Sequence, residues 1–233
     1  AVASFPVKYF YQENGGKHRA INRGAQEAHG GLFFIADADD WLAPNTIELV
    51  LQEYNEIKNK KEFGGVCGLD AKEDGIVVGK GLPQDVMECS SHELKYIHNV
   101  TGDMKEVFLT SVMKEFPFPE IDGEKFCPED LVWNRIARKY KLRYFNKVIY
   151  LVEYQCDGLT ANIIKIRMNS PIASTIHYAE LIETKIPFSL KIKTAINYWR
   201  FWMCLKKKSD APGIGLLWSW ALPVGWAMHP NDL

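Results

Sequence analysis

The stretch LFFIADADD, residues 32–40, decides the fold class of this chain. Its first five residues are continuously apolar, which is typical of a strand buried on both faces in a parallel sheet covered by helices. Three carboxylates, Asp37, Asp39 and Asp40, follow directly. Ligands of open α/β sheets bind beyond the carboxyl ends of the strands, so we expect these side chains to project into a ligand site.

The flanking segments predict alternating strands and helices. Residues 5–11 (FPVKYFY) are rich in β-branched and aromatic residues and predict a strand. Residues 17–29 predict a helix, because Ile21, Ala25 and Ala28 share one face, and a second helix follows Pro44. This order is typical of an α/β fold.

The rest of the chain is less regular. Residues 81–99 show no clear period, and Pro128 is expected at the first position of a helix. Residues 110–116 predict a short helix capped by Thr110. From residue 162 the chain is mostly helical in pattern. Further strands are predicted at residues 64–69, 76–78, 104–109 and 142–154.

The composition limits the function classes. The 233 residues are 47% hydrophobic, which excludes a disordered chain. With 28 basic and 29 acidic residues there is no global positive field, so we expect no nucleic-acid partner. Five cysteines without a C-x-x-C pair favour neither a disulfide framework nor a zinc site, and a cytoplasmic location fits best. The start, AVASF, lacks Met and signal-peptide features, and we interpret it as a cut.

Two motifs predict chemistry. The turn Gly15-Gly16 leads into Lys17, His18 and Arg19 at a helix N-terminus, which suits a phosphate; the alternative is a solvated basic first turn, although cations oppose the helix dipole there. The three carboxylates after residue 36 predict a hard cation, Mg²⁺ or Mn²⁺, that also bridges to substrate phosphates. The alternative is an ordinary Asp-rich turn.

Four segments together carry a family resemblance: QENGGKHRAINRG (12–24), LFFIADADDWL (32–42), GDMKEVF (102–108) and GEKFCPEDLVWNRI (123–136). In this order they resemble bacterial family 2 glycosyltransferases of the GT-A fold, of the cell-surface polysaccharide type, over residues 5–157. The resemblance implies an α/β, GT-A-like nucleotide-diphospho-sugar transferase fold, a Rossmann-like mixed sheet flanked by helices that lacks its N-terminal part. It divides the chain into a partial catalytic domain, residues 1–157, and a C-terminal helical extension, residues 158–233.

The same resemblance implies a reaction and a site. The reaction is inverting transfer of a sugar from a nucleoside diphosphate sugar, commonly a UDP-sugar, to a saccharide or lipid-linked acceptor in surface glycan synthesis. The metal ligands are Asp37, Asp39 and Asp40, either Glu129 or Asp130 is the base, and Asp103 and Trp133 are weaker acceptor contacts. The implied nucleotide-sugar site is Asn14, Gly15, Lys17, His18, Arg19, Asn22, Asp37 and Ala38. The alternative is a degenerate, non-catalytic domain that binds a nucleotide or glycan.

The C-terminal region adds a possible second partner. Residues 189–208 predict an amphipathic helix, and residues 211–228 carry no charge. Five of the seven Trp residues lie between residues 199 and 226, and Trp favours the membrane headgroup level. Two interpretations stay open: peripheral attachment to the inner face of the plasma membrane, or packing of this tail on the globular body.

Overall fold

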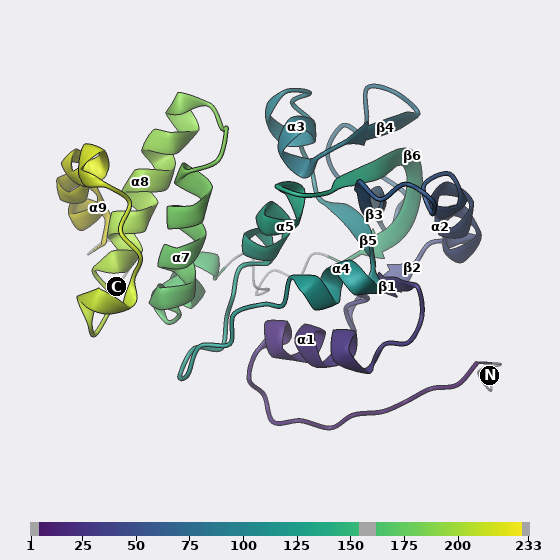
Figure 1. The fold of residues 1–233 in the computed structure, drawn as a ribbon, viewed down its shortest axis with the longest axis horizontal. Helices are drawn as coiled ribbons and strands as arrows, with labels where there is room; N and C mark the ends of the chain where they lie inside the picture. The colour runs from purple at the N-terminus through teal and green to yellow at the C-terminus, as the bar shows by residue number, and fades with distance from the viewer. Residues whose placement is uncertain (1–4, 154–161, 230–233) are drawn as a thin grey trace.

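The computed structural model describes residues 5–153 and 162–229. Strand β3 (Phe63–Lys72) pairs in parallel with β6 (Lys141–Val152) and antiparallel with β5 (Met104–Leu109). Strand β1 (Leu32–Phe34) continues the sheet beyond β5, while β2 (Trp41–Leu42) and β4 (Val86–Cys89) share the far side of β6. Within the described residues these six strands form one mixed sheet (Figure 1).

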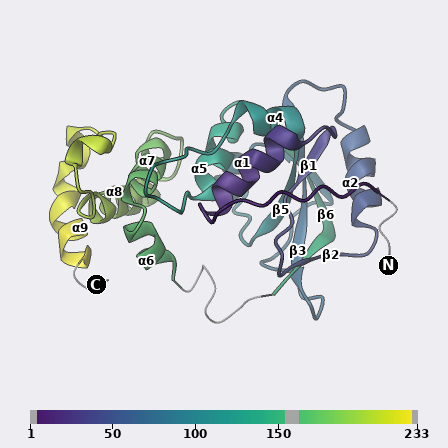
Figure 2. The ribbon, with the colours of Figure 1, turned by 90° about the horizontal axis from the view of Figure 1, so that it is seen from below.

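Helices cover both faces of this sheet because each buries an apolar stripe on it. The larger core cluster joins the sheet to α1 (Lys17–Glu27), α3 (Ser91–Tyr96), α4 (Thr110–Glu115) and α5 (Glu129–Ala137). A second cluster joins it to α2 (Thr46–Asn55). Figure 2 shows α1 and α4 side by side, with α2 on the other side of the strands.

The C-terminal helices form a body of their own beside α5 (Figure 1). Its core cluster includes Tyr198, Trp218 and Ala221. The elements are α6 (Ile163–Met168), α7 (Pro171–Ile182), α8 (Phe188–Trp202), the 3₁₀ helices η1 (Lys208–Asp210) and η2 (Leu216–Ala221), and α9 (Leu222–Met228).

Most predicted elements are present, with shifted ends. The helix predicted for residues 17–29 is α1, the helix after Pro44 is α2, and the strand at 104–109 is β5. The strand predicted at 142–154 is β6, although residue 154 lies outside the described residues. The predicted domain boundary between residues 157 and 158 also lies outside them.

One strand prediction at the N-terminal side is wrong, and a second is right about the strand but wrong about its burial and direction. Residues 5–11 form no strand; this segment runs outside α1, where Arg23 contacts the Tyr11 carbonyl and the Phe10 ring (Figure 1). It lacks a neighbouring strand among the described residues, so its aromatic content alone does not produce one. The apolar run at 32–36 yields the short β1, which is half-buried and antiparallel to β5. Burial on both faces belongs instead to β3.

Several local predictions also need correction. Leu109 rather than Thr110 precedes α4 as its cap residue, and the buried Thr110 hydroxyl has no hydrogen-bond partner. Pro128 stands one position before the first residue of α5. Residues 76–78 form a single bridge, between Val77 and Ala71. The segment 81–99 contains β4 and α3, and α3 begins with a capping box between Ser90 and Glu93.

Substitution of Ile149 tests the core next to β3. Ile149 has no exposed surface and packs in the cluster that α2 covers. We expect Ile149→Ala to lower the free energy of unfolding by about 2–5 kcal/mol, because a cavity adds to the lost apolar burial. Urea unfolding measures this change. Ile47→Ala is the control: Ile47 is 55% exposed, and a loss there as large as that of Ile149→Ala would contradict the assignment of the core.

Candidate functional site

A cavity of about 850 Å³ opens where β3 and β6 end. This volume lies within the range of small-molecule sites, about 300–1,000 Å³. Its walls come from segments far apart in the sequence: the start of α1, the loop after β1, the start of β5, and helices α3, α5 and α6. Asp37, Asp39 and Asp40, which the sequence predicted to project into a ligand site, all line this cavity.

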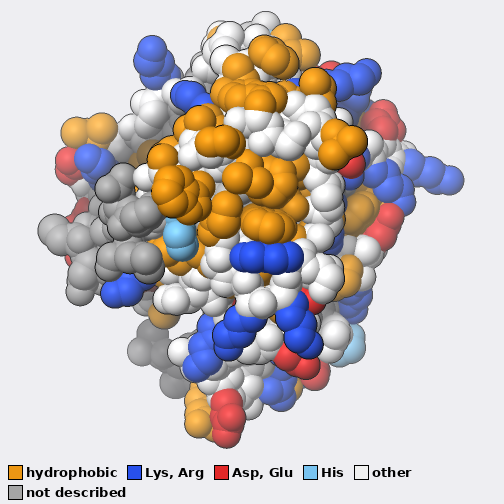
Figure 3. All heavy atoms as spheres, turned by 90° about the vertical axis from the view of Figure 1, so that its left-hand side faces the viewer, with side chains coloured by type: hydrophobic (Ala, Val, Ile, Leu, Met, Phe, Trp, Pro, Cys, Tyr) orange, Lys and Arg blue, Asp and Glu red, His pale blue; other side chains and the backbone are white. Residues whose placement is uncertain are grey.

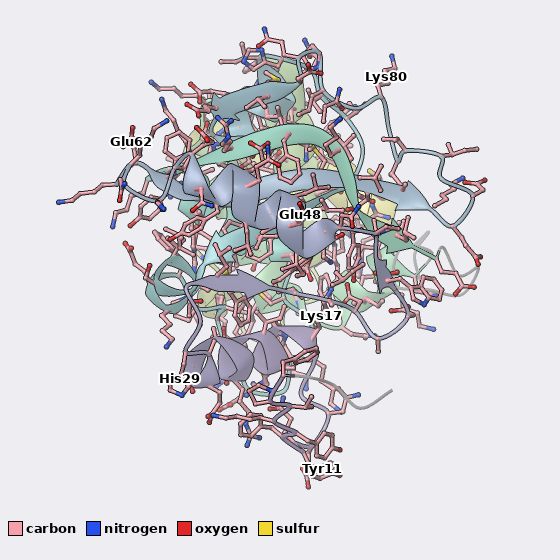
Figure 4. All side chains as sticks on the ribbon, turned by 90° about the vertical axis from the view of Figure 1, so that its right-hand side faces the viewer. Tyr11, Lys17, His29, Glu48, Glu62 and Lys80 are labelled. Atoms are coloured by element: carbon pink, nitrogen blue, oxygen red, sulfur yellow. The ribbon has the colours of Figure 1, made fainter. Side chains whose placement is uncertain are left out.

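The ammonium group of Lys17 joins two of these segments. Its Nζ lies 2.7 Å from Asp37 Oδ1 and 2.8 Å from Glu129 Oε1. Desolvation lowers the Lys17 pKa, but the charges and hydrogen bonds of Glu129 and Asp37 outweigh it, and the net pKa is raised. Figure 4 shows Lys17 at one end of α1 and His29 beyond the other. The ammonium therefore stays charged and holds the acidic loop against the start of α5.

The geometry of the turn before α1 explains this position of Lys17. Gly16 caps the helix with φ 97°, a conformation that side chains disfavour. A Cβ atom on Gly16 would also lie 2.0 Å from the carbonyl oxygen of Lys125. The close approach to the loop that leads into α5 therefore requires glycine here.

Asp37 has two further contacts. Lys105 Nζ lies 3.8 Å from Asp37 Oδ2 and 3.7 Å from the centre of the Tyr150 ring, a cation–π contact. The backbone N–H of Asp37 donates to the Tyr150 hydroxyl at 2.7 Å. Asp37 is therefore fixed by two ammonium groups and one aromatic hydroxyl.

The other two carboxylates of the predicted metal set differ from Asp37. Asp40 Oδ1 accepts a hydrogen bond from the Glu153 N–H at 3.2 Å, whereas Asp39 is exposed and has no partner among the described residues. Over these residues no three His, Cys, Asp or Glu side chains are grouped closely enough to hold a metal ion. Carboxylate oxygens suit Mg²⁺ or Mn²⁺, which needs only one or two of them when substrate phosphates supply further ligands. The donor chemistry thus fits a cation held jointly with a substrate.

Two carboxyl groups on the cavity floor were not predicted from the sequence. Desolvation raises the pKa of Asp70 to about 7, and its Oδ1 has no hydrogen-bond partner. Glu106 touches the cavity, yet protein atoms surround it so closely that desolvation raises the pKa of its carboxyl to about 8. The signal available for Glu106 was a carboxylate next to Lys105 inside the strand predicted for residues 104–109.

The two candidate bases differ in their surroundings. Both Glu129 and Asp130 line the cavity from the first turn of α5. Glu129 is engaged by Lys17, whereas Asp130 is exposed and no described residue pairs with it. The structure therefore separates a carboxylate held in an ion pair from one that is available for proton transfer.

Several residues of the implied nucleotide-sugar site lie away from the cavity. Arg19 donates to Glu120 and to the Ile121 carbonyl, and Asn22 exchanges hydrogen bonds with the backbone of Phe118. These contacts tie α1 to the loop before α5, so both side chains act structurally. Asn14, Gly15 and Ala38 also lie outside the cavity lining. The Oδ1 atom of Asn14 accepts a hydrogen bond from the Gly16 N–H.

His18 lines the cavity but does not supply a cation. It is buried, its Nδ1 has no partner, and desolvation together with the charge of Arg19 lowers the pKa of the ring. The imidazole is therefore neutral at pH 7. Of the three basic residues predicted to receive a phosphate, only Lys17 brings a positive charge into the cavity.

The two weaker acceptor candidates are both at the cavity wall. Asp103 is exposed just before β5, and Trp133 reaches the cavity from α5. The Trp133 ring packs 4.7 Å from the Phe108 ring and 5.6 Å from the Phe118 ring, measured between centroids. Packing fixes this indole in the wall.

Two cations on the α3 and α6 walls were also missed. Lys95 comes from α3, whose capping box at Ser90 and Glu93 was a readable signal. Arg167 comes from α6, its guanidinium stacks over Phe126, and its buried Nη1 lacks a partner. No described acidic residue forms an ion pair with Lys95 or Arg167.

Solved structures with a similar fold support this architecture. The crystal structure of S. aureus TarS 1-349 matches 96% of this chain and 61% of its own, with a TM-score of 0.50 and 13% identity. The structure of the same TarS fragment in complex with UDP-GlcNAc matches 97% and 64%, with a TM-score of 0.51 and 13% identity. The prediction of a GT-A-like mixed sheet flanked by helices is confirmed.

Sequence comparisons find similarity to glycosyltransferases. The family model described as Glycosyl transferase family 2 matches residues 1–66. An uncharacterized glycosyltransferase of Rickettsia conorii is 35% identical over 72 residues, 30% of this chain and 12% of the relative. Another, of Rickettsia bellii, is 26% identical over 149 residues, 62% of this chain and 21% of the relative.

The resemblance to family 2 glycosyltransferases that the sequence motifs predicted is confirmed by this match over residues 1–66. The chain spans about a fifth or less of the length of these two curated relatives.

The pKa of Asp70 predicts how stability changes with pH. Above pH 4 an unfolded chain ionises Asp70, but the folded protein binds its proton up to about pH 7, so wild-type stability falls between these values. Asp70→Asn removes this penalty. We expect it to be more stable than wild type by up to about 4 kcal/mol at pH 9, at about 1.4 kcal/mol per pKa unit, and equally stable at pH 4.

Urea unfolding at pH 4, 7 and 9 measures the difference. The exposed Asp122→Asn is the matched control and is expected to change stability little at any of the three values. A gain for Asp70→Asn that stays constant from pH 4 to 9 would show that the carboxyl is not desolvated.

Proposed function

We propose that this chain supplies catalytic residues of an inverting glycosyltransferase that uses a nucleoside diphosphate sugar, specifically a UDP-sugar. The observation that carries the proposal is the cavity of about 850 Å³ in which the segments at residues 17–18, 37–40 and 129–130 meet. Three sequence-distant motifs of the family resemblance thus share one site. The match to a fold that binds UDP-GlcNAc in TarS supports the same donor class.

The donor side of the cavity is assigned to Asp37, Asp39 and Lys17. Lys17 and Lys105 place two ammonium groups beside Asp37, so negative charge that develops on a departing diphosphate has positive partners within the site. We propose that Mg²⁺ or Mn²⁺ is bound with Asp39 as the principal protein ligand and Asp37 and Asp40 beside it. A bound cation of this kind supplies Lewis-acid stabilisation of the leaving group.

Asp130 is proposed as the general base. Inversion by direct displacement requires a group that removes the proton of the acceptor hydroxyl as the bond to the sugar forms. Asp130 is exposed to the cavity without an ion-pair partner among the described residues, while Glu129 is held by Lys17. We assign Glu129 to positioning Lys17, and Asp130 to the proton.

The acceptor is proposed to be a saccharide or a lipid-linked glycan in surface glycan synthesis at the cytoplasmic face of a membrane. Asp103 and Trp133 line the wall available to it. Lys95 and Arg167, unpaired by described acids, favour an acceptor that carries a phosphate, as lipid-linked sugars do.

A substitution at Asp39 tests the donor site. We expect Asp39→Asn in the full-length protein to lower the rate of sugar transfer at least about 100-fold, since a metal contributes several kcal/mol to the transition state. Calorimetry with UDP-GlcNAc is the second readout, and we expect Mn²⁺ to strengthen binding in the wild type and in Asp122→Asn but not in Asp39→Asn. If Asp37→Ala combined with Asp39→Ala leaves transfer intact, the proposed function is wrong.

Paired substitutions in α5 test the base. We expect Asp130→Asn to lower kcat by about 10²–10⁴-fold with UDP-GlcNAc affinity unchanged, because general base catalysis contributes that much. We expect Glu129→Gln to lower the affinity for UDP-GlcNAc by a larger factor than it lowers kcat, because it removes the ion pair that positions Lys17. The opposite pattern would exchange the two roles. Metal-dependent UDP binding without transfer, over a panel of donors and acceptors, would favour the non-catalytic alternative.

A further inference from the structure

The C-terminal helices expose an unusual amount of apolar surface. Leu216 is 92% exposed, Leu217 75% and Trp226 61%. Figure 3 shows apolar side chains gathered over this end of the molecule. We define the C-terminal apolar face by its exposed members: Phe188, Leu216, Leu217, Trp220, Val224, Trp226 and Met228.

The same segment is firmly attached to the protein by its other side. Trp218 and Ala221 of η2 are buried against α8, and Trp199 Nε1 donates a hydrogen bond to the Trp218 carbonyl at 2.8 Å. Gly225 is buried so closely against α8 that a Cβ atom there would lie 2.8 Å from Trp199 Cβ. The tail therefore has two different sides. One side packs against α8, and the other side is exposed.

Positive charge lies beside the C-terminal apolar face. Residues 188–229 contain six Lys or Arg and one Asp, although the whole chain has a net charge of −1. Lys193, Lys206 and Lys207 are exposed and have no acidic partner among the described residues. Lys208 differs, because its ammonium donates to the carbonyls of Trp202, Met203 and Leu205. Figure 3 shows Lys and Arg side chains beside and below the apolar area.

We propose that the C-terminal apolar face binds the surface of a bilayer that contains anionic lipids. Leu216, Leu217 and Val224 would enter the outer acyl region, and the indoles of Trp220 and Trp226 would lie at the headgroup level. Lys193, Lys206 and Lys207 would contact anionic headgroups. The attachment is peripheral in mode: across residues 5–153 and 162–229, no helix has both the length and the apolar character to cross a membrane.

Charge favours this occupant over a second copy of the chain. A symmetric dimer through the C-terminal apolar face would bring two lysine-rich rims together, which costs free energy through like-charge repulsion. An anionic bilayer complements both the apolar centre and the basic rim. The proposal stands independently of the sugar-transfer reaction.

Vesicle flotation with the full-length protein tests the proposal. We expect binding to vesicles of phosphatidylcholine with 30% phosphatidylglycerol to exceed binding to pure phosphatidylcholine at least about tenfold, and 0.5 M NaCl to reduce it. Leu216→Asn with Leu217→Asn, and separately Lys206→Gln with Lys207→Gln, are each expected to lower binding at least about tenfold. Because all four side chains are exposed, folding should be unaffected.

Matched controls change the same residue types elsewhere. Ile47→Asn with Ile76→Asn exchanges two exposed apolar residues, and Lys61→Gln with Lys80→Gln removes two exposed charges. Figure 4 shows Lys80 at the edge of the molecule. We expect both control variants to bind vesicles like the wild type. Three outcomes would overturn the proposal. The controls could lose as much binding as the test variants, or the protein could bind both vesicle types equally. The protein could also form a dimer that Leu216→Asn with Leu217→Asn dissociates, without binding vesicles. UDP-GlcNAc binding, measured in parallel, reports on the donor site separately.

Discussion

The parallel pairing of β3 with β6 is the constraint on which the rest of the N-terminal α/β body depends. Nine of the ten β3 residues are buried, so the strand fits only at the centre of the sheet with helices on both faces. Its partner β6 runs in the same direction, and Asp70 stands opposite Tyr150 near the ends of the two strands. The site forms there because carboxyl ends of parallel strands share one edge.

Electrostatics then joins the loops that reach this edge. The Tyr150 hydroxyl accepts a hydrogen bond from the backbone N–H of Asp37, and Lys17 forms ion pairs with both Asp37 and Glu129. A lysine between two carboxylates compensates charges that would otherwise repel, and it makes the start of α1, the acidic loop and the start of α5 one unit. Burial has the opposite effect on Asp70 and Glu106: it raises the pKa of both carboxyl groups, to about 7 and about 8, so each carries its proton part of the time near neutral pH.

Local sequence patterns predicted a helix or strand correctly where the folded protein also supplies a surface or a strand for that element to pack against or pair with. The helix predicted at residues 17–29 and the strand predicted at 104–109 form as α1 and β5, because each buries apolar residues against the rest of the protein. Residues 5–11 have the composition of a strand but no strand to pair with among the described residues, and hydrogen bonding between strands is what a β-strand requires. The segment 81–99 was missed because β4 and α3 are too short to show a period, although the capping box at Ser90 was readable.

The sequence by itself predicted the resemblance to family 2 glycosyltransferases, the fold class and the motifs that line the cavity, because residue type and spacing carry that information directly. It could not decide which side chains of a motif face the ligand: Lys17 enters the cavity, while Arg19 and Asn22 bind the loop at residues 118–121. It also could not distinguish Glu129 from Asp130, nor the packed side of the C-terminal tail from the exposed one. The positions of Lys17, Asn22 and Glu129 depend on contacts between segments about 100 residues apart, and the packing of the tail depends on the contact of Trp218 with Trp199 in α8. Only the tertiary structure brings such segments together.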